Sequence, residues 1–190
     1  VRRFLVSQAI VLSLAGVPGI YVHNLFGSRS YRAGVKLSGQ YRSINREKFR
    51  HGELKQALAD PSSLCHRVFY PYLHLIRTRT AHRAFHPSGA QRVLGGHETG
   101  SDALFALVRT APEGGRKVLC VHNVSNAEQP FSANLPSLSL PSSDRVCDLI
   151  TGVAHPVERT SSLSLRMAPY QVVWLEMKDP DSGASTLDGA

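Results

Sequence analysis

Apolar residues in the first part of the chain recur with helical spacing and then gather in one short block. Residues 2–14 place an apolar side chain at every third or fourth position, which predicts a buried helix. Gly16-Val17-Pro18-Gly19 ends that helix, and Ile20–His23 predicts a short apolar strand. A helix, a tight turn and a buried strand form the repeating step of a parallel α/β sheet. The polar, glycine-bearing residues 24–46 then predict a long loop, and such loops usually carry function.

Two further helices are predicted before the pattern changes. His51–Ala59 has the composition of a short helix, and Asp60-Pro61-Ser62-Ser63 has the residue types that begin a new one. From Leu64 to about Thr80 the apolar residues again follow helical spacing, which predicts a longer amphipathic helix.

After residue 84, short alternating runs separated by glycine, proline and serine predict an antiparallel β domain. The runs are Arg92–Leu94, Ala103–Thr110, Lys117–Val124, Phe131–Leu135, Val146–Leu149, Ser162–Met167 and Gln171–Met177. About ninety residues of this kind suit a small β-sandwich, with Tyr170 and Trp174 expected in its core or, alternatively, on a carbohydrate-binding face. The predicted division is residues 1–84, residues 85–178, and a disordered tail at 179–190.

Composition narrows the classes of partner. The net charge is +8 and the sequence pI about 9.8, which favours anionic partners. The basic residues are scattered, without an arginine-rich run or a zinc-finger pattern, so we expect no nucleic-acid partner. The apolar residues 4–22 are interrupted by Gly16, Pro18 and Gly19, so we expect no membrane span. Three widely spaced cysteines outside any metal-binding pattern indicate reduced thiols in a cytoplasmic protein, and no metal site.

Three motifs follow one another in a specific order. Gly16–Tyr21 has the pattern G-x-P-x-x-Y, Gly39–Arg46 has G-x-x-R-x-I-N-R, and Ala168–Leu175 reads APYQVVWL. In this order they resemble the α-amylase family, and in particular its sucrose phosphorylases with their glucosylglycerate and sucrose 6-phosphate relatives. The resemblance covers about residues 1–178. The segment His23–Ser28 departs from the sucrose-specific members, which leaves the acceptor sugar open.

The resemblance implies a fold of the α/β plus all-β class, in which the C-terminal end of a (β/α)8 TIM barrel precedes an antiparallel β-sandwich. Residues 1–84 would supply the last barrel steps, with the subsite loop at 23–46. The chain also starts inside an apolar helical pattern, so we expect a C-terminal fragment of a longer enzyme.

The resemblance further implies a retaining glycoside phosphorylase that transfers glucose from a sucrose-like α-glucoside to phosphate and releases α-glucose 1-phosphate. Inorganic phosphate would be a co-substrate, with no metal or organic cofactor. The catalytic carboxylates should precede residue 1, so the chain alone is expected to be inactive. Two alternatives stay open: an α-glucosidase, amylase-type hydrolase or transglucosidase, and a non-catalytic β-sandwich module that binds carbohydrate or a partner. The oligomeric state stays open as well.

Five residues are candidates for substrate binding. By resemblance, Arg42 is the arginine that reaches the glucose subsite, where its rigid fork suits a carboxylate and a sugar hydroxyl. His23 and Asn24 stand at the acceptor-side loop, either as ligands of acceptor or phosphate or as structural residues. Arg29, after Gly27-Ser28, either offers a cation beside backbone N–H groups to phosphate or lies exposed in a turn. Arg46 is either a partner behind the site or a surface residue.

Overall fold

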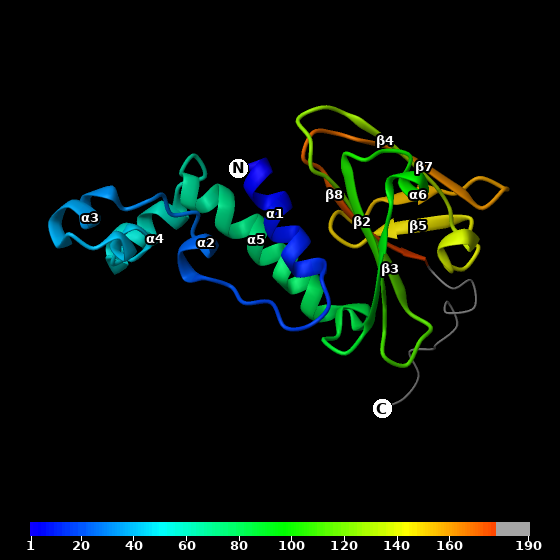
Figure 1. Ribbon diagram of the computed structural model, residues 1–190, viewed down its shortest axis with the longest axis horizontal. Coiled ribbons are helices and arrows are strands. Elements are labelled where there is room, and N and C mark those ends of the chain that lie inside the picture. The colour runs from blue at the N-terminus through cyan, green and yellow to red at the C-terminus, as the bar shows by residue number, and fades with distance from the viewer. Residues whose placement is uncertain (178–190) are drawn as a thin grey trace.

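The computed structural model describes residues 1–177, in which a helical part leads into a β part (Figure 1). The predicted helices at 2–14, 51–59 and 64–80 are confirmed as α1, α4 and α5. The α-helices are α1 Arg2–Ser13, α2 Val22–Leu25, α3 Arg32–Ser38, α4 His51–Ala59, α5 Leu64–Ala81 and α6 Gly96–Thr99. Three 3-10 helices are η1 Tyr41–Asn45, η2 Arg83–Phe85 and η3 Pro136–Leu138.

The β part contains two antiparallel sheets. Its strands are β1 Ala90–Leu94, β2 Leu104–Thr110, β3 Lys117–Asn123, β4 Gln129–Asn134, β5 Arg145–Asp148, β6 Ala154–Pro156, β7 Ser162–Met167 and β8 Val172–Met177. The larger sheet has the order β1-β2-β3-β8-β5-β6, and β4 pairs with β7 in the smaller one. All seven predicted runs therefore become strands, while β6 and α6 were not predicted. The predicted tail at 179–190 lies outside the described residues.

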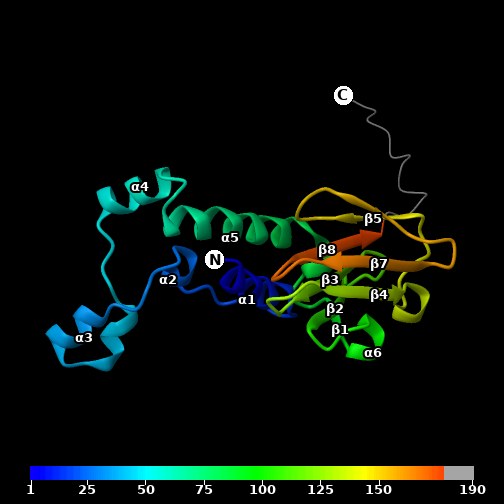
Figure 2. The same ribbon diagram turned by 90° about the horizontal axis from the view of Figure 1, so that it is seen from above.

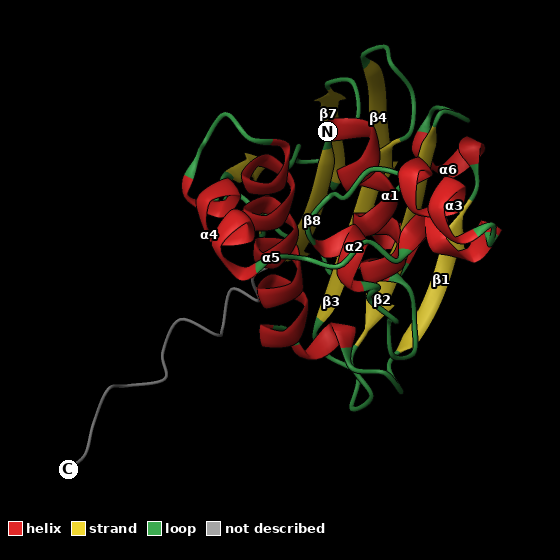
Figure 3. Ribbon diagram, turned by 90° about the vertical axis from the view of Figure 1, so that its left-hand side faces the viewer, coloured by secondary structure: helices red, strands yellow, loops and turns green. Residues whose placement is uncertain are grey.

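The larger sheet has two buried faces, because successive side chains along a strand point to opposite sides. Leu119, Val173 and Leu175 face the smaller sheet and form the sandwich core with residues such as Phe131 and Leu163. The opposite face carries Leu107, Cys120 and Trp174 and packs against the helical part. Figure 3 shows α1 and α5 lying across that second face.

Trp174 belongs to the second core, so its predicted place in the sandwich core is wrong. It is fully buried and packs on Phe85, with ring centroids 4.7 Å apart, while Leu12 and Tyr72 reach the same cluster from α1 and α5. Its position in β8 puts it on the face opposite to Val173 and Leu175. Tyr170 is only half-buried and occupies a left-handed turn with φ 58° before the strand.

The two buried guanidinium groups of Arg79 and Arg109 hold the end of α1. Arg79 donates hydrogen bonds to the carbonyl oxygens of Leu12, Leu14 and Gly16. Arg109 donates from Nη1 to the Ser13 carbonyl at 3.0 Å and from Nη2 to the His86 carbonyl at 2.9 Å. The last carbonyls of a helix lack partners within it, and these arginines supply them. They therefore fasten the exit of α1 to α5 and to the larger sheet.

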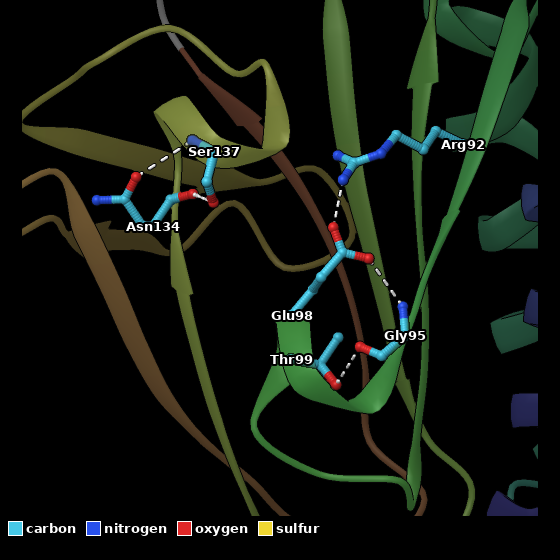
Figure 4. A network of polar contacts seen from close by, with 6 residues as sticks. All are labelled: Arg92, Gly95, Glu98, Thr99, Asn134 and Ser137. Atoms are coloured by element: carbon cyan, nitrogen blue, oxygen red, sulfur yellow. Dashed lines mark hydrogen bonds and ion pairs between the residues drawn. The ribbon is translucent and has the colours of Figure 1, made fainter.

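Small polar networks close the far end of the β part (Figure 4). Glu98 in α6 accepts a hydrogen bond from the Gly95 N–H at 3.0 Å and pairs with Arg92 of β1. After β4, the Ser137 N–H donates to Asn134 Oδ1 at 3.1 Å. Each of these contacts joins residues that are close in the chain. They therefore stabilise two turns, the one between β1 and β2 and the one after β4.

The predicted strand at Ile20–His23 is wrong. Residues 17–21 have no regular structure, and α2 begins at Val22. A strand needs a neighbour, and no strand lies beside this segment in the described residues. The long loop predicted at 24–46 is corrected as well, since it contains α3 and η1. Every strand pair among residues 1–177 is antiparallel.

Candidate functional site

The segment with the predicted binding residues folds as two short pieces that are tied together. The Tyr21 hydroxyl donates a hydrogen bond to the Asn45 carbonyl, and the Tyr31 N–H donates to the Ile44 carbonyl at 2.6 Å. A β-carbon on Gly34 would lie 2.2 Å from the Tyr31 ring, so glycine is required for this close approach. The structure thus brings the start of the segment and the R-x-I-N-R motif side by side.

An aromatic cluster anchors the same segment on α5. His23 is buried, and its ring centroid lies 5.2 Å from Tyr21 and 4.7 Å from Phe49. Phe26 lies 5.2 Å from Phe49 and stacks on Phe69 of α5 at 5.4 Å. His23 is therefore placed among rings, in the surroundings of a structural residue, whereas Asn24 beside it is exposed.

Arg42 lies on η1, and its side chain is exposed. Its Nε donates to Gln40 Oε1 at 2.8 Å. No ion pair of Arg42 with a carboxylate is present among residues 1–177. Arg46 ends the same 3-10 helix and is also exposed, so both guanidiniums remain accessible.

The turn Gly27-Ser28-Arg29 uses two of its N–H groups internally. Gly27 donates to the Asn24 carbonyl at 3.1 Å and Ser28 to the His23 carbonyl at 2.8 Å. Those two groups are therefore engaged, and the exposed Arg29 side chain is what the turn presents to solvent.

A hollow of about 290 Å³ lies beside this turn, between it, the residues before α4, and the first turns of α4 and α5. Its charged lining comprises Arg29, Glu47, Lys48, Arg50 and Glu53. Glu53 pairs with Arg50 at 3.7 Å, and both side chains are largely exposed. Cys65 also lines the hollow, and burial raises the pKa of its thiol, which favours the protonated form.

The five predicted binding residues thus share one segment but not one cavity. Arg29 lines the hollow, while His23, Asn24, Arg42 and Arg46 do not. Among residues 1–177, no group of three or more histidine, cysteine, aspartate and glutamate side chains is arranged to hold a metal ion. No helix in that range is long and apolar enough to cross a membrane.

Sequence reasoning missed the hollow and the two carboxylates in its lining. In the sequence alone, Glu47 and Glu53 have the character of ordinary surface carboxylates in or beside a helical segment. Their spacing of six residues carries no recognisable pattern, because the hollow arises only when Gly27–Arg29 folds back against α4 and α5.

Comparisons with known proteins agree with the motifs, although no family model matches the chain. A glucosylglycerate phosphorylase of Spirochaeta thermophila is 40% identical over 178 residues, which are 92% of this chain and 30% of the relative. One of Allomeiothermus silvanus is 43% identical over 132 residues, which are 70% of this chain and 22% of the relative. The chain thus spans less than a third of the curated relatives it matches.

Solved structures of similar fold include two α-amylases. An Anoxybacillus α-amylase superposes on 93% of this chain and 32% of its own, with a TM-score of 0.65 and 12% identity. The α-amylase of H. orenii gives a TM-score of 0.63 and 18% identity over 93% of this chain and 36% of its own. At such identities the likeness concerns the fold. The predicted resemblance is confirmed: this chain is similar in sequence to glucosylglycerate phosphorylases and in fold to part of the enzymes of the α-amylase family.

Proposed function

We propose that the chain is part of a retaining glycoside phosphorylase that releases α-glucose 1-phosphate from an α-glucoside and phosphate. The observation that carries this proposal is the 40% identity to a glucosylglycerate phosphorylase over 92% of the chain. The same relatives favour glucosylglycerate over sucrose as the substrate. The departure of His23–Ser28 from the sucrose-specific pattern agrees with that preference.

In the proposed reaction, a carboxylate attacks the anomeric carbon while a carboxylic acid protonates the leaving oxygen of glycerate. A phosphate oxygen then attacks the glycosyl-enzyme, and the carboxylate leaves as the new C–O bond forms. We assign both carboxyl groups to a part of the enzyme that this chain does not contain. In support, the buried Asp148 is fully used in structure: its Oδ1 accepts from the Trp174 N–H at 3.0 Å and its Oδ2 from Thr151 at 2.6 Å.

For the binding residues, we propose that Arg42 serves the glucose subsite and that Arg29 and Asn24 face the acceptor or phosphate. His23 would then support the segment from behind, and the exposed Arg46 would be a surface residue at its end. Their exposure or burial is compatible with these roles, since Arg29, Asn24 and Arg42 are exposed and His23 is buried among rings. No cofactor is proposed besides phosphate as co-substrate.

We further propose that residues 1–84 form the last steps of a (β/α)8 barrel and that the protein is cytoplasmic. The superposition of nearly the whole chain on α-amylases supports the first point. The three free cysteines support a reducing compartment.

The test compares this chain with the longer enzyme that contains it. Each is incubated with glucosylglycerate, with and without phosphate, and glucose 1-phosphate and glucose are measured. We expect phosphate-dependent glucose 1-phosphate from the longer enzyme and no turnover by the 190-residue chain. Turnover by the chain alone would contradict the assignment of the carboxylates. Glucose release without phosphate would instead identify the alternative hydrolase, and transfer to a second sugar the transglucosidase.

The alternative of a freestanding carbohydrate-binding β module has less support. It requires residues 1–84 to be an appendage, yet Leu12 and Tyr72 share one core with Trp174. It also needs an exposed aromatic face, and Trp174 is fully buried. Binding of glycans by residues 85–178 alone, measured by calorimetry, would restore this alternative.

A further inference from the structure

Another hollow, of about 500 Å³, lies where the end of α1 meets the end of α5 and η2. Figures 1 and 2 show that both helices end beside the β part. This hollow shares no lining residue with the one beside Gly27–Arg29. Most of its lining is apolar and includes Val17, Ile20 and Phe85, so its walls suit the apolar body of a small ligand.

The charged lining of this hollow contains cations and no carboxylate. The residues that can carry a positive charge are Arg79, His82, Arg83 and His86. Arg83 pairs with Glu113 at 3.2 Å and His82 with Glu176 at 2.8 Å, and neither acid lines the hollow. Arg79, by contrast, belongs to no ion pair among residues 1–177. Its charge is therefore the one that a ligand could neutralise.

The positive charge of Arg79 is buried next to that of Arg109. Arg79 is 6% exposed and Arg109 is fully buried, and Arg109 also lacks an ion pair in the described part of the chain. Burial lowers the pKa of Arg79, and the charge of Arg109 lowers it further. Their hydrogen bonds go to backbone carbonyls, which carry only partial negative charge. Because buried charges without counterions are costly, an anion in the hollow would stabilise both groups.

Arg79 also keeps donors for such an anion. A guanidinium has five N–H groups. Arg79 uses Nη1 for the carbonyls of Leu12 and Leu14 and Nη2 for that of Gly16, whereas Nε makes no hydrogen bond with residues 1–177. No buried side-chain nitrogen in that range lacks a partner, so this Nε is accessible. Since Arg79 lines the hollow, its remaining N–H groups can donate to an oxyanion there.

We propose that this hollow binds a small amphipathic anion, with a carboxylate or phosphate head at Arg79 and an apolar body against Val17, Ile20 and Phe85. Its volume of about 500 Å³ lies in the range of small-molecule sites. The ligand would strengthen the exit of α1, which Arg79 already holds. The inference does not depend on the proposed reaction.

The probes are hexanoate and hexyl phosphate, each titrated into the 190-residue chain by calorimetry. We expect one-to-one binding, and the tighter of the two probes identifies the preferred head group. Hexanol has the same apolar body without the charge, and inorganic phosphate has the charge without the body. Each of these should bind at least about tenfold more weakly than the tighter probe.

Val17→Asp is the test variant, because it places a carboxylate in the lining, next to Gly16, whose carbonyl accepts from Arg79 at 2.6 Å. This carboxylate should compete with the anion and weaken its binding at least about tenfold. Val17→Asn, of the same shape but uncharged, is the matched control and should change the affinity less than about threefold. Val17 is 83% exposed, so both variants should fold, which melting followed by circular dichroism verifies. Arg79→Met would also remove the hydrogen bonds that hold α1, so it is the less specific variant.

Four results would overturn the proposal. The first is no binding of either anion up to about 10 mM. The second is hexanol that binds as tightly as the anions, which would make the hollow a site for neutral apolar molecules. The third is equal binding by Val17→Asp and Val17→Asn. The fourth is binding to this chain but not to the longer enzyme that contains it, which would show that the hollow is covered there.

Discussion

At the scale of single residues, the buried polar groups of the second core are satisfied by partners from distant parts of the chain. His122 is fully buried, with Nδ1 3.0 Å from the Phe105 carbonyl and Nε2 accepting from the Trp174 indole at 3.5 Å. This arrangement suits a neutral ring with its proton on Nδ1. Burial lowers the pKa of His122 to about 4.

His122 should therefore make stability depend on pH. Its pKa lies near 6.5 in the unfolded chain and about 4 in the folded one, so the unfolded state binds more protons between these values. Stability should rise with pH through this window, and about 3 kcal/mol should be lost as pH falls from 6.5 to 4. Urea unfolding at several pH values, compared with His122→Gln, measures the difference. Parallel pH profiles of the two proteins would contradict the expectation.

Arg109 should be required for the fold. Burial lowers the pKa of its guanidinium, and its hydrogen bonds go to backbone carbonyls. Arg109→Met leaves those buried carbonyls unsatisfied and should lower the free energy of unfolding by roughly 3 kcal/mol or more. The control is Arg166→Met, whose exposed pair with Glu128 should contribute less than about 1 kcal/mol. If both variants lose a similar free energy of unfolding in urea, the hydrogen bonds of Arg109 at the end of α1 do not stabilise the fold as expected.

At the scale of elements, the turn that follows α2 packs against α5, and this packing depends on the close approach of one glycine to the helix. Gly27 has φ 62°, and a β-carbon there would lie 2.7 Å from Val68 Cγ2. Since the helix cannot move without disturbing the second core, a side chain at this position should displace the turn.

Gly27→Ala should destabilise the chain by about 2–4 kcal/mol, combining backbone strain with the clash. Gly152→Ala is the control, because Gly152 has φ 74° and open space around its β position, so it should cost only about 1 kcal/mol. Adding Val68→Ala should partly rescue Gly27→Ala, and thermal melts of the original chain, the two single variants Gly27→Ala and Val68→Ala, and the double variant measure this. A double variant that is no more stable than Gly27→Ala alone would rule out the contact.

The sequence predicts an element well when the contacts that stabilise it are made by residues close by in the chain. α5 was predicted because its helical spacing and the Ser63 cap, which accepts from the His66 N–H, lie within a few residues. The prediction of a strand at Ile20–His23 was wrong because a strand must pair with a neighbouring strand, even where the apolar residues favour the extended conformation. The sequence also does not predict which core contains Trp174. The alternation of side chains along a strand defines two faces of the sheet, but it does not show which element covers each face. The five candidate binding residues lie in one segment of the sequence, but which of them are exposed depends on tertiary contacts.

At the scale of the whole molecule, the larger sheet joins two cores, and the predicted domain boundary near residue 84 would divide the second of them. One core lies between the sheets and the other beneath α1 and α5. The β part therefore depends on the helical part to cover Leu107, Cys120 and Trp174.

Residues 85–178 alone should accordingly be much less stable than the full chain. Trp174 is the single tryptophan, so its fluorescence reports the exposure of the second core directly. We expect red-shifted emission, binding of an apolar dye, and a lower melting temperature for the shortened protein. Emission unchanged from the full chain would show that the helices are dispensable. Leu37→Gln in the full chain is the control, because Leu37 is exposed and belongs to α3, which lies at the opposite end of the helical part from the sheets (Figure 1).

The position of β8 also dictates when the protein can finish folding. This strand is the last described element, yet it lies in the middle of the larger sheet, between β3 and β5. Until it leaves the ribosome, the sheet is split into two pieces, and α1 has waited through more than 150 residues of synthesis for Trp174. At roughly 5–20 residues per second, the part of α1 that meets Trp174 waits many seconds for that side chain. The larger sheet is therefore completed only by its last described strand, and a chain cut just before β8 should have both cores open.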